Sequence, residues 1–202
     1  LEYIKNLSEY LVENPYITAP KHIKLLNTIE SYDFQRIPNI IYVNGFGETL
    51  SCSDTKEDIE IKAFTNGVKV IVLNKENCDI SENKFTELNY FQGNIDFVAS
   101  YFAMKKILET GGIFLGRNMK ISAPFNSLRM NNCFFSYESN TVINGEFFGG
   151  KVGNKYMSDI IDLIERNGFE LKLSNLSDCI LYSLLINENY VVSVNKKNNL
   201  NN

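Results

Sequence analysis

The chain has 202 residues, of which 44% are hydrophobic and 22% are charged, and this composition is typical of a soluble globular domain. Its formal net charge of −4 argues against a nucleic-acid partner, because non-specific binding to nucleic acid needs a basic face. One histidine, His22, and no tryptophan are present; this excludes a multi-histidine metal centre and leaves any Ser-His-Asp triad dependent on a single residue.

The four cysteines are widely spaced and form no C-x-x-C pair: Cys52, Cys78, Cys133 and Cys179. A zinc site and a disulfide framework are therefore not expected, and reduced thiols fit a cytoplasmic protein. No window approaches the roughly 20 apolar residues of a membrane span, so we expect none. The sequence leaves open whether further residues precede Leu1, which is not an initiator methionine.

Residues 1–36 are expected to form a helical appendage. Apolar side chains at Tyr3, Leu7 and Leu11 recur on one helix face, and two prolines then interrupt the pattern. A second short helix is predicted over residues 21–32.

Residues 37–194 are expected to form an α/β domain. The run from Ile37 to Val43 is apolar, rich in β-branched residues and entered through a proline, which predicts a buried strand. A helix is predicted over residues 54–66, and a second buried strand over residues 68–73. A strand–helix–strand order predicts a parallel sheet with a right-handed crossover.

The clearest helix covers residues 94–110, with Asn94 as its N-cap and Gly111 at its end. Short strands are expected at residues 113–115, 119–121 and 133–137. The Gly-rich stretch at residues 142–150 is expected to be irregular.

The last amphipathic helix is expected over residues 154–167, with Asn154 as its cap and Gly168 beyond it. Terminal strands are expected at residues 179–186 and 190–194. The polar segment 195–202 is expected to be a disordered tail.

Six short segments occur in order between residues 37 and 149: IPNII, FG, NKENCDI, DFVAS, LETGGIFL and NGEFFG. Together they resemble the DxD-containing sugar transferases of glycosyltransferase family 32, which include capsular-polysaccharide enzymes. The resemblance implies a GT-A fold, an α/β sandwich that binds its ligand at the carboxyl ends of the strands. It also implies a nucleotide-diphospho-sugar donor and a glycan acceptor.

The resemblance assigns eight positions to the nucleotide-sugar or to the acceptor pocket: Tyr42, Val43, Tyr101, Asn118, Asn144, Gly145, Phe148 and Gly149. Glu138, near the end of a predicted strand, either faces an acceptor sugar as a catalytic acid or only caps the strand.

The metal-binding motif of the family is replaced in this chain. The family holds Mn or Mg with two aspartates after the Gly-Gly strand, and those positions read Gly116, Arg117 and Asn118 here, so the usual ligands are absent and no cofactor is expected. The helix acid of the family aligns with Tyr101, and its helix arginine aligns with Met104.

Two interpretations of these replacements remain open. In the first, catalysis continues without metal, because the Arg117 guanidinium can neutralise a diphosphate through bidentate hydrogen bonds. In the second, Arg117 is a solvated turn residue and the chain is an inactive homologue that binds or regulates an active transferase.

Two further features carry weaker hypotheses. The segment Gly45–Gly47 follows a strand as a dinucleotide-binding loop does, but it lacks the third glycine and is also compatible with a plain turn. Asp96 is interpreted as an acid that stabilises a helix N-terminus rather than as a base.

Overall fold

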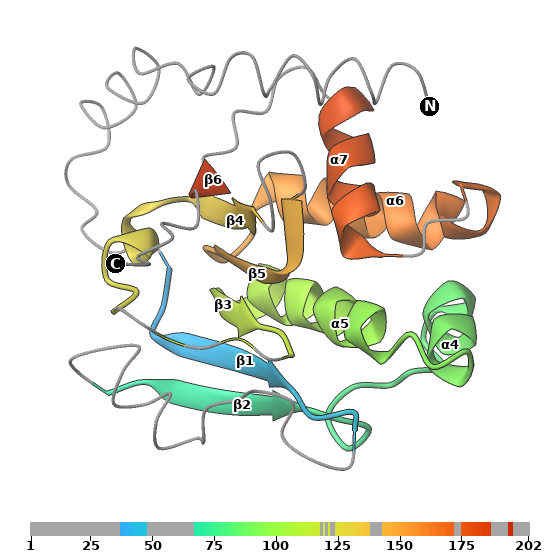
Figure 1. Ribbon diagram of the computed structural model, residues 1–202, viewed down its shortest axis with the longest axis horizontal. Coiled ribbons are helices and arrows are strands. Elements are labelled where there is room, and N and C mark those ends of the chain that lie inside the picture. Colours follow the sequence, from blue (N-terminus) through green and yellow to red (C-terminus); the bar gives the residue numbers. More distant parts are fainter. Residues whose placement is uncertain are drawn as a thin grey trace, which may run out of the picture.

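The strands of the described residues form one mixed sheet. The structure is a computed structural model, and it describes residues 37–47, 67–117, 119, 121, 124–137, 143–171, 175–186 and 194–195. Their order across the sheet is β2 (Lys69–Leu73), β1 (Ile40–Asn44), β3 (Gly112–Leu115), β5 (Ile143–Gly150), β4 (Cys133–Tyr137) and β6 (Val194–Asn195), as Figure 1 shows.

Strand direction brings the ends of three strands and the start of a fourth to one edge of the sheet. β1 pairs in parallel with both β2 and β3, whereas β5 runs antiparallel to β3 and β4. The carboxyl ends of β1, β2 and β3 therefore lie at the same edge as the beginning of β5. In open α/β sheets this is the edge at which ligands bind.

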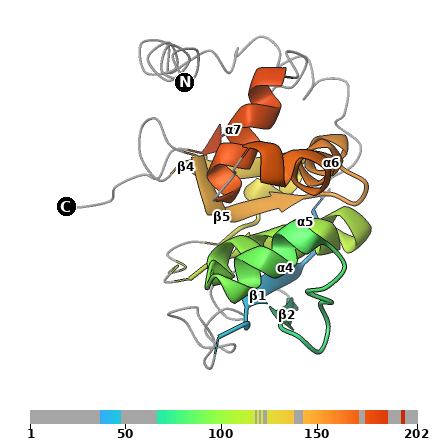
Figure 2. The same cartoon turned by 90° about the vertical axis from the view of Figure 1, so that its right-hand side faces the viewer.

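The helices gather on one face of the sheet (Figures 1 and 2). They are α4 (Lys84–Phe91), α5 (Ile95–Thr110), α6 (Lys155–Leu171) and α7 (Leu176–Ile186). None of the helices in the described ranges is long and apolar enough to cross a bilayer.

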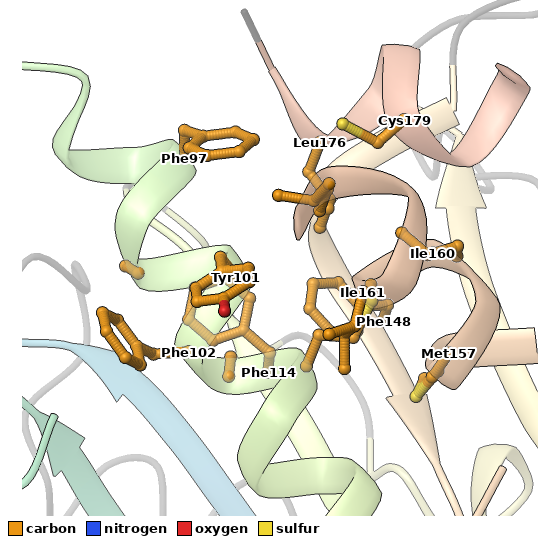
Figure 3. Close-up of a cluster of buried hydrophobic side chains, with 14 of the residues drawn as sticks. Phe97, Tyr101, Phe102, Phe114, Phe148, Met157, Ile160, Ile161, Leu176 and Cys179 are labelled. Carbon is orange, nitrogen blue, oxygen red and sulfur yellow. The ribbon is translucent and has the colours of Figure 1, made fainter. Parts of the chain in front are cut away.

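The main core lies between these helices and the sheet. Phe148 of β5 packs against Phe114 of β3 and Phe135 of β4, with ring centroids 5.3 Å and 5.7 Å apart. Figure 3 shows Phe114 and Phe148 facing side chains of α5, α6 and α7, such as Tyr101 and Ile160. This packing fixes α5 across the centre of the sheet.

A second, smaller core covers the opposite face of the sheet. Ile41 and Val43 of β1 join Ile113 and Leu115 of β3 there, packed against residues of the segment that leads into the 3₁₀ helix η1 (Leu128–Met130). Because both faces of the central strands are buried, β1 and β3 read as continuous apolar runs rather than as alternating ones.

Most predicted strands and helices are confirmed. Strands β1, β2, β3 and β4 and helices α5 and α6 lie within a few residues of the predicted ranges. Gly111 ends α5 with φ of 72°, and the Asn154 side chain caps α6 by accepting from the Met157 amide. Asn94 does precede α5, but its side chain donates to Asn89 instead of capping the helix.

Several other predictions were wrong. Residues 143–150 form strand β5, because they pair with strands on both sides. Residues 176–186 form helix α7 rather than a strand, and Asn175 caps it by accepting from the Asp178 amide. Met119 and Ile121 belong to no strand, and α4 was not predicted. A short apolar run fits a buried helix as well as a strand, which explains the error at α7.

The expected appendage (residues 1–36), the expected helix at residues 54–66 and all of the expected tail except Asn195 lie outside the described residues.

Gly168 lies inside α6 rather than beyond it, and we expect Gly168→Ala to destabilise the protein. Alanine in a helix interior is ordinarily favoured over glycine by about 1 kcal/mol. Here a Cβ at position 168 would lie 2.6 Å from Cδ1 of Phe85, so overpacking is expected to lower the free energy of unfolding by about 1–3 kcal/mol. Urea denaturation measures this, with the exposed Asp162→Ala on the same helix as the control. A stabilised Gly168→Ala protein would contradict the close packing of α4 on α6.

Candidate functional site

A polar cluster occupies the ligand-binding edge of the sheet. Asn44 is the last residue of β1, Arg117 lies two residues after β3, and Asp96 lies in the first turn of α5. One carboxylate oxygen of Asp96, Oδ1, accepts a hydrogen bond from Arg117 Nε at 2.9 Å and another from Asn44 Nδ2 at 3.1 Å. We call these three residues the Asn44–Asp96–Arg117 cluster.

Solvent exposure increases along the cluster, from the buried Asn44 side chain to the accessible Arg117 cation. Asn44 is 1% exposed, and its Oδ1 accepts from the Phe46 amide at 3.0 Å, so its side-chain amide is fixed in orientation. The side chains of Arg117 and Asp96 are 40% and 45% exposed. Within the described part of the chain, Nη1 and Nη2 of Arg117 make no hydrogen bond, so both are available to an anion. Two guanidinium amines side by side suit a phosphate.

Gly116 lies beside the cluster at a point where the chain is closely packed. Its amide donates to the Glu146 carbonyl of β5 at 2.6 Å. A Cβ at position 116 would lie 2.3 Å from Cβ and 2.9 Å from Cγ of Glu146. No side chain fits there without movement of β5. The resemblance to family 32 aligns this position with a metal-binding aspartate.

The residues present do not fit a divalent metal held in the manner of the family. Gly116 supplies no ligand, Arg117 is a cation, and Asp96 Oδ1 already accepts two hydrogen bonds. Among the described residues no three His, Cys, Asp or Glu side chains come together in a metal-binding group. Hard cations need several oxygen ligands, so this donor set favours an anion over a cation.

Five of the residues predicted to bind the nucleotide-sugar are core residues instead. Tyr42, Val43, Tyr101 and Phe148 are at most 1% exposed, and Gly149 is buried with its Cα against the Phe134 ring. In this arrangement a ligand cannot contact them without opening the core. They were assigned by alignment with the family, and alignment does not report which face of an element a side chain joins.

The two tyrosines make hydrogen bonds in different places. The Tyr42 hydroxyl pairs with Thr110 Oγ1 at the end of α5 opposite to Asp96. The Tyr101 hydroxyl donates to Glu165 Oε1 of α6 at 2.7 Å. Figure 3 draws Tyr101 itself among the core side chains. Burial raises the pKa of both phenols, and the Glu165 carboxylate raises that of Tyr101 further. Because the two hydroxyls lie in different places, the two tyrosines and Arg117 do not line one pocket.

Two residues of the predicted sugar loop do lie at the edge. Asn144, half-buried at the start of β5, accepts from the Glu146 amide at 2.7 Å. The Gly145 amide donates to Ser177 Oγ of α7 at 3.1 Å. The remaining predicted site residues, Asn118 and Glu138, lie outside the described residues.

The loop after β1 is shaped by packing rather than by a glycine fingerprint. A Cβ on Gly45 would lie 2.2 Å from Val72 Cγ1, so glycine is required by the close approach of β2.

Lys75, just after β2, places its ammonium 4.5 Å from the centre of the Tyr90 ring, a cation–π contact. Lys75 is thus a second cation at the same edge as Arg117.

Sequence reasoning missed Asn44 and Glu146 and gave Asp96 only a helix-dipole role. Asp96 does lie in the first turn of α5, but it also bonds two residues that are distant in sequence. The available signal was positional, because Asn44 ends a predicted buried strand and Asp96 begins a predicted helix. Such ends meet at the ligand-binding edge of a parallel sheet.

The fold is similar to that of a known glycosyltransferase. A solved structure titled "PaToxG Glycosyltransferase" superposes with a TM-score of 0.54 over 85% of this chain and 78% of that chain, at 13% sequence identity. At this identity the likeness shows the fold alone. No protein-family model matches the chain. No curated protein matches it either.

We expect Tyr101→Phe to lower stability and leave ligand binding unchanged. The variant loses the hydrogen bond to the partly exposed Glu165 carboxylate, which places the expected loss at the low end of the roughly 1.5–3 kcal/mol of a bond to a charged group. The unfolded phenol ionises near its ordinary pKa of 10.0 while the folded phenol stays neutral, so the Tyr101 contribution to stability is lost as pH rises above about 10. Urea denaturation at neutral and alkaline pH should show a shallower alkaline loss in the variant. A variant of wild-type stability that no longer binds nucleotide would place Tyr101 in the site.

Proposed function

We propose that the chain is a glycosyltransferase of the GT-A type that uses a nucleotide-diphospho-sugar donor and acts in polysaccharide or glycoconjugate synthesis. The Asn44–Asp96–Arg117 cluster carries this proposal, because it offers an anion-binding cation at the carboxyl edge of the sheet. The similarity of fold to a glycosyltransferase and the six-segment resemblance to family 32 support it.

Glycosyl transfer from such a donor requires that the negative charge on the leaving nucleoside diphosphate be neutralised. An acceptor hydroxyl attacks the anomeric carbon, and the bond between that carbon and the diphosphate oxygen breaks. The hydroxyl proton passes to a carboxylate base, for which Glu138 is the candidate from the sequence. The nucleoside diphosphate leaves with an additional negative charge. Donors that are already oriented toward this charge stabilise the transition state, and the Nη atoms of Arg117 are suited to do so.

The proposed reaction is independent of metal. In the resemblance to family 32, Gly116 and Arg117 align with the first metal-binding acid and the residue after it. The carboxylate that bonds Arg117, that of Asp96, already accepts hydrogen bonds from two side chains. In this proposal the guanidinium takes the charge-neutralising role that Mn or Mg has in the family. Asn144 and Gly145 lie at the same edge and are proposed to face the sugar or the acceptor.

Calorimetric titration with uridine and guanosine diphosphates, once in EDTA and once with manganese, tests this function. We expect one of the two to bind, and Arg117→Ala to weaken it by about 10- to 100-fold, since a hydrogen bond to a charged group is worth about 1.5–3 kcal/mol. Arg166→Ala is the matched control, because Arg166 also forms an exposed ion pair, with Asp162 on α6.

No binding of either nucleotide by the wild-type protein, in EDTA or with manganese, would contradict the proposal and favour an inactive homologue that serves as the partner of an active transferase. Binding that requires Mn and survives Arg117→Ala would contradict metal independence.

Restoring the family's two acids is expected not to restore metal binding. In Gly116→Asp/Asn118→Asp the new side chain at position 116 would overlap Glu146, so we expect a loss of about 1–3 kcal/mol in stability and no gain of Mn affinity. Thermal denaturation and Mn titration measure the two effects. Adding Glu146→Ala should not relieve the overlap fully, because the Glu146 Cβ and carbonyl remain close. A double variant that binds Mn at wild-type stability would refute the fit argument.

A further inference from the structure

We propose that Asp96 is the positioning residue of Arg117 and that Asn44 orients Asp96 for this purpose. The inference rests on the proposed function, since it assumes that Arg117 binds the diphosphate. It assigns a role to two residues that the family resemblance does not place in the site. Its basis is the hydrogen-bond chain from a buried strand end to an accessible guanidinium.

The chain of hydrogen bonds has a clear direction. The Phe46 amide donates to Asn44 Oδ1, Asn44 Nδ2 donates to Asp96 Oδ1, and Arg117 Nε donates to the same oxygen. Asn44 is buried and belongs to the central strand β1, so it is the most rigid member. Orientation is therefore set in the core and passed outward to the arginine.

The bond at Nε leaves the binding face of the guanidinium open. A carboxylate that gripped Nη1 and Nη2 would compete with a phosphate for the same two donors. Asp96 bonds Nε instead and thereby holds the plane of the group. An arginine held in this way loses less side-chain entropy when a diphosphate binds.

Two simpler roles for Asp96 explain less. The Asp96–Arg117 pair is nearly half exposed on both sides, and exposed pairs contribute little to stability. An acid that only stabilises the α5 N-terminus needs no partner on β1 or after β3. A negative charge beside Arg117 also opposes an incoming anion, so a pure charge effect and a positioning effect have opposite signs.

Titration with inorganic pyrophosphate in EDTA shows whether removal of Asp96 lowers or raises the affinity for an anion, and so distinguishes the positioning effect from the charge effect. We expect Asp96→Ala to bind pyrophosphate about 5- to 10-fold more weakly than wild type, because Arg117 is no longer oriented, although a negative charge has been removed. Asp96→Asn keeps an acceptor oxygen for Arg117 Nε and loses the charge, so we expect affinity equal to wild type or higher. In an Arg117→Ala background, Asp96→Ala is expected to cause no further loss.

The outcomes distinguish the inference from the function on which it rests. One outcome is that Arg117→Ala loses pyrophosphate binding while Asp96→Ala binds pyrophosphate as tightly as wild type, or more tightly. This outcome would overturn the positioning role and leave the proposed function standing. Weaker binding upon Asp96→Ala in both backgrounds would point to general damage and would also overturn it. Wild-type protein that binds neither pyrophosphate nor a nucleoside diphosphate would overturn the function itself.

Discussion

The packing of α5 across the centre of the sheet is the constraint on which the rest of the molecule depends. The helix packs on β1, β3 and β5 and joins them to α6 and α7 in one core. Because α5 runs opposite to the parallel strands, its first turn comes to the edge where β1 and β3 end. Asp96 can then reach both Asn44 and Arg117. The candidate site is a consequence of this helix position.

The same packing buries residues that the resemblance to family 32 had assigned to the site. Tyr101 lies where the family has a helix acid, and a phenol at that position can be buried if its hydroxyl finds a partner, which Glu165 supplies. A buried aspartate there would need a charge partner or would have to be protonated, because an unpaired carboxylate is costly in a low-dielectric setting. Tyr101 is therefore a core residue in this structure, and the accessible charged groups at this edge include those of Asp96 and Arg117.

The sequence predicted the parallel part of the fold because those elements carry strong local signals. β1 is an apolar run entered through a proline, and α5 ends at a glycine with positive φ. β5 and α7 were misassigned because their identity depends on tertiary partners. Residues 143–150 form a strand because they pair with β3 on one side and β4 on the other. Gly149 is accommodated there because the Phe134 ring leaves no room for a side chain.

The candidate site was predictable only in part. Arg117 was predicted from the resemblance to family 32, whereas the roles of Asn44 and Asp96 depend on hydrogen bonds between residues 52 and 21 positions apart. No local pattern reports such a contact, and one sequence alone does not show which strand ends are neighbours. Family alignment placed Tyr42 and Tyr101 in the site because it carries position along the chain but not the direction of a side chain.

A crystal structure with the nucleoside diphosphate that binds, grown in EDTA, tests the central claim most directly. The account predicts a diphosphate at the carboxyl edge of β1 and β3, with phosphate oxygens within hydrogen-bond distance of Nη1 and Nη2 of Arg117. Asp96 would still accept from Arg117 Nε. A diphosphate bound elsewhere, or one that leaves the Arg117 side chain without contact, would contradict it.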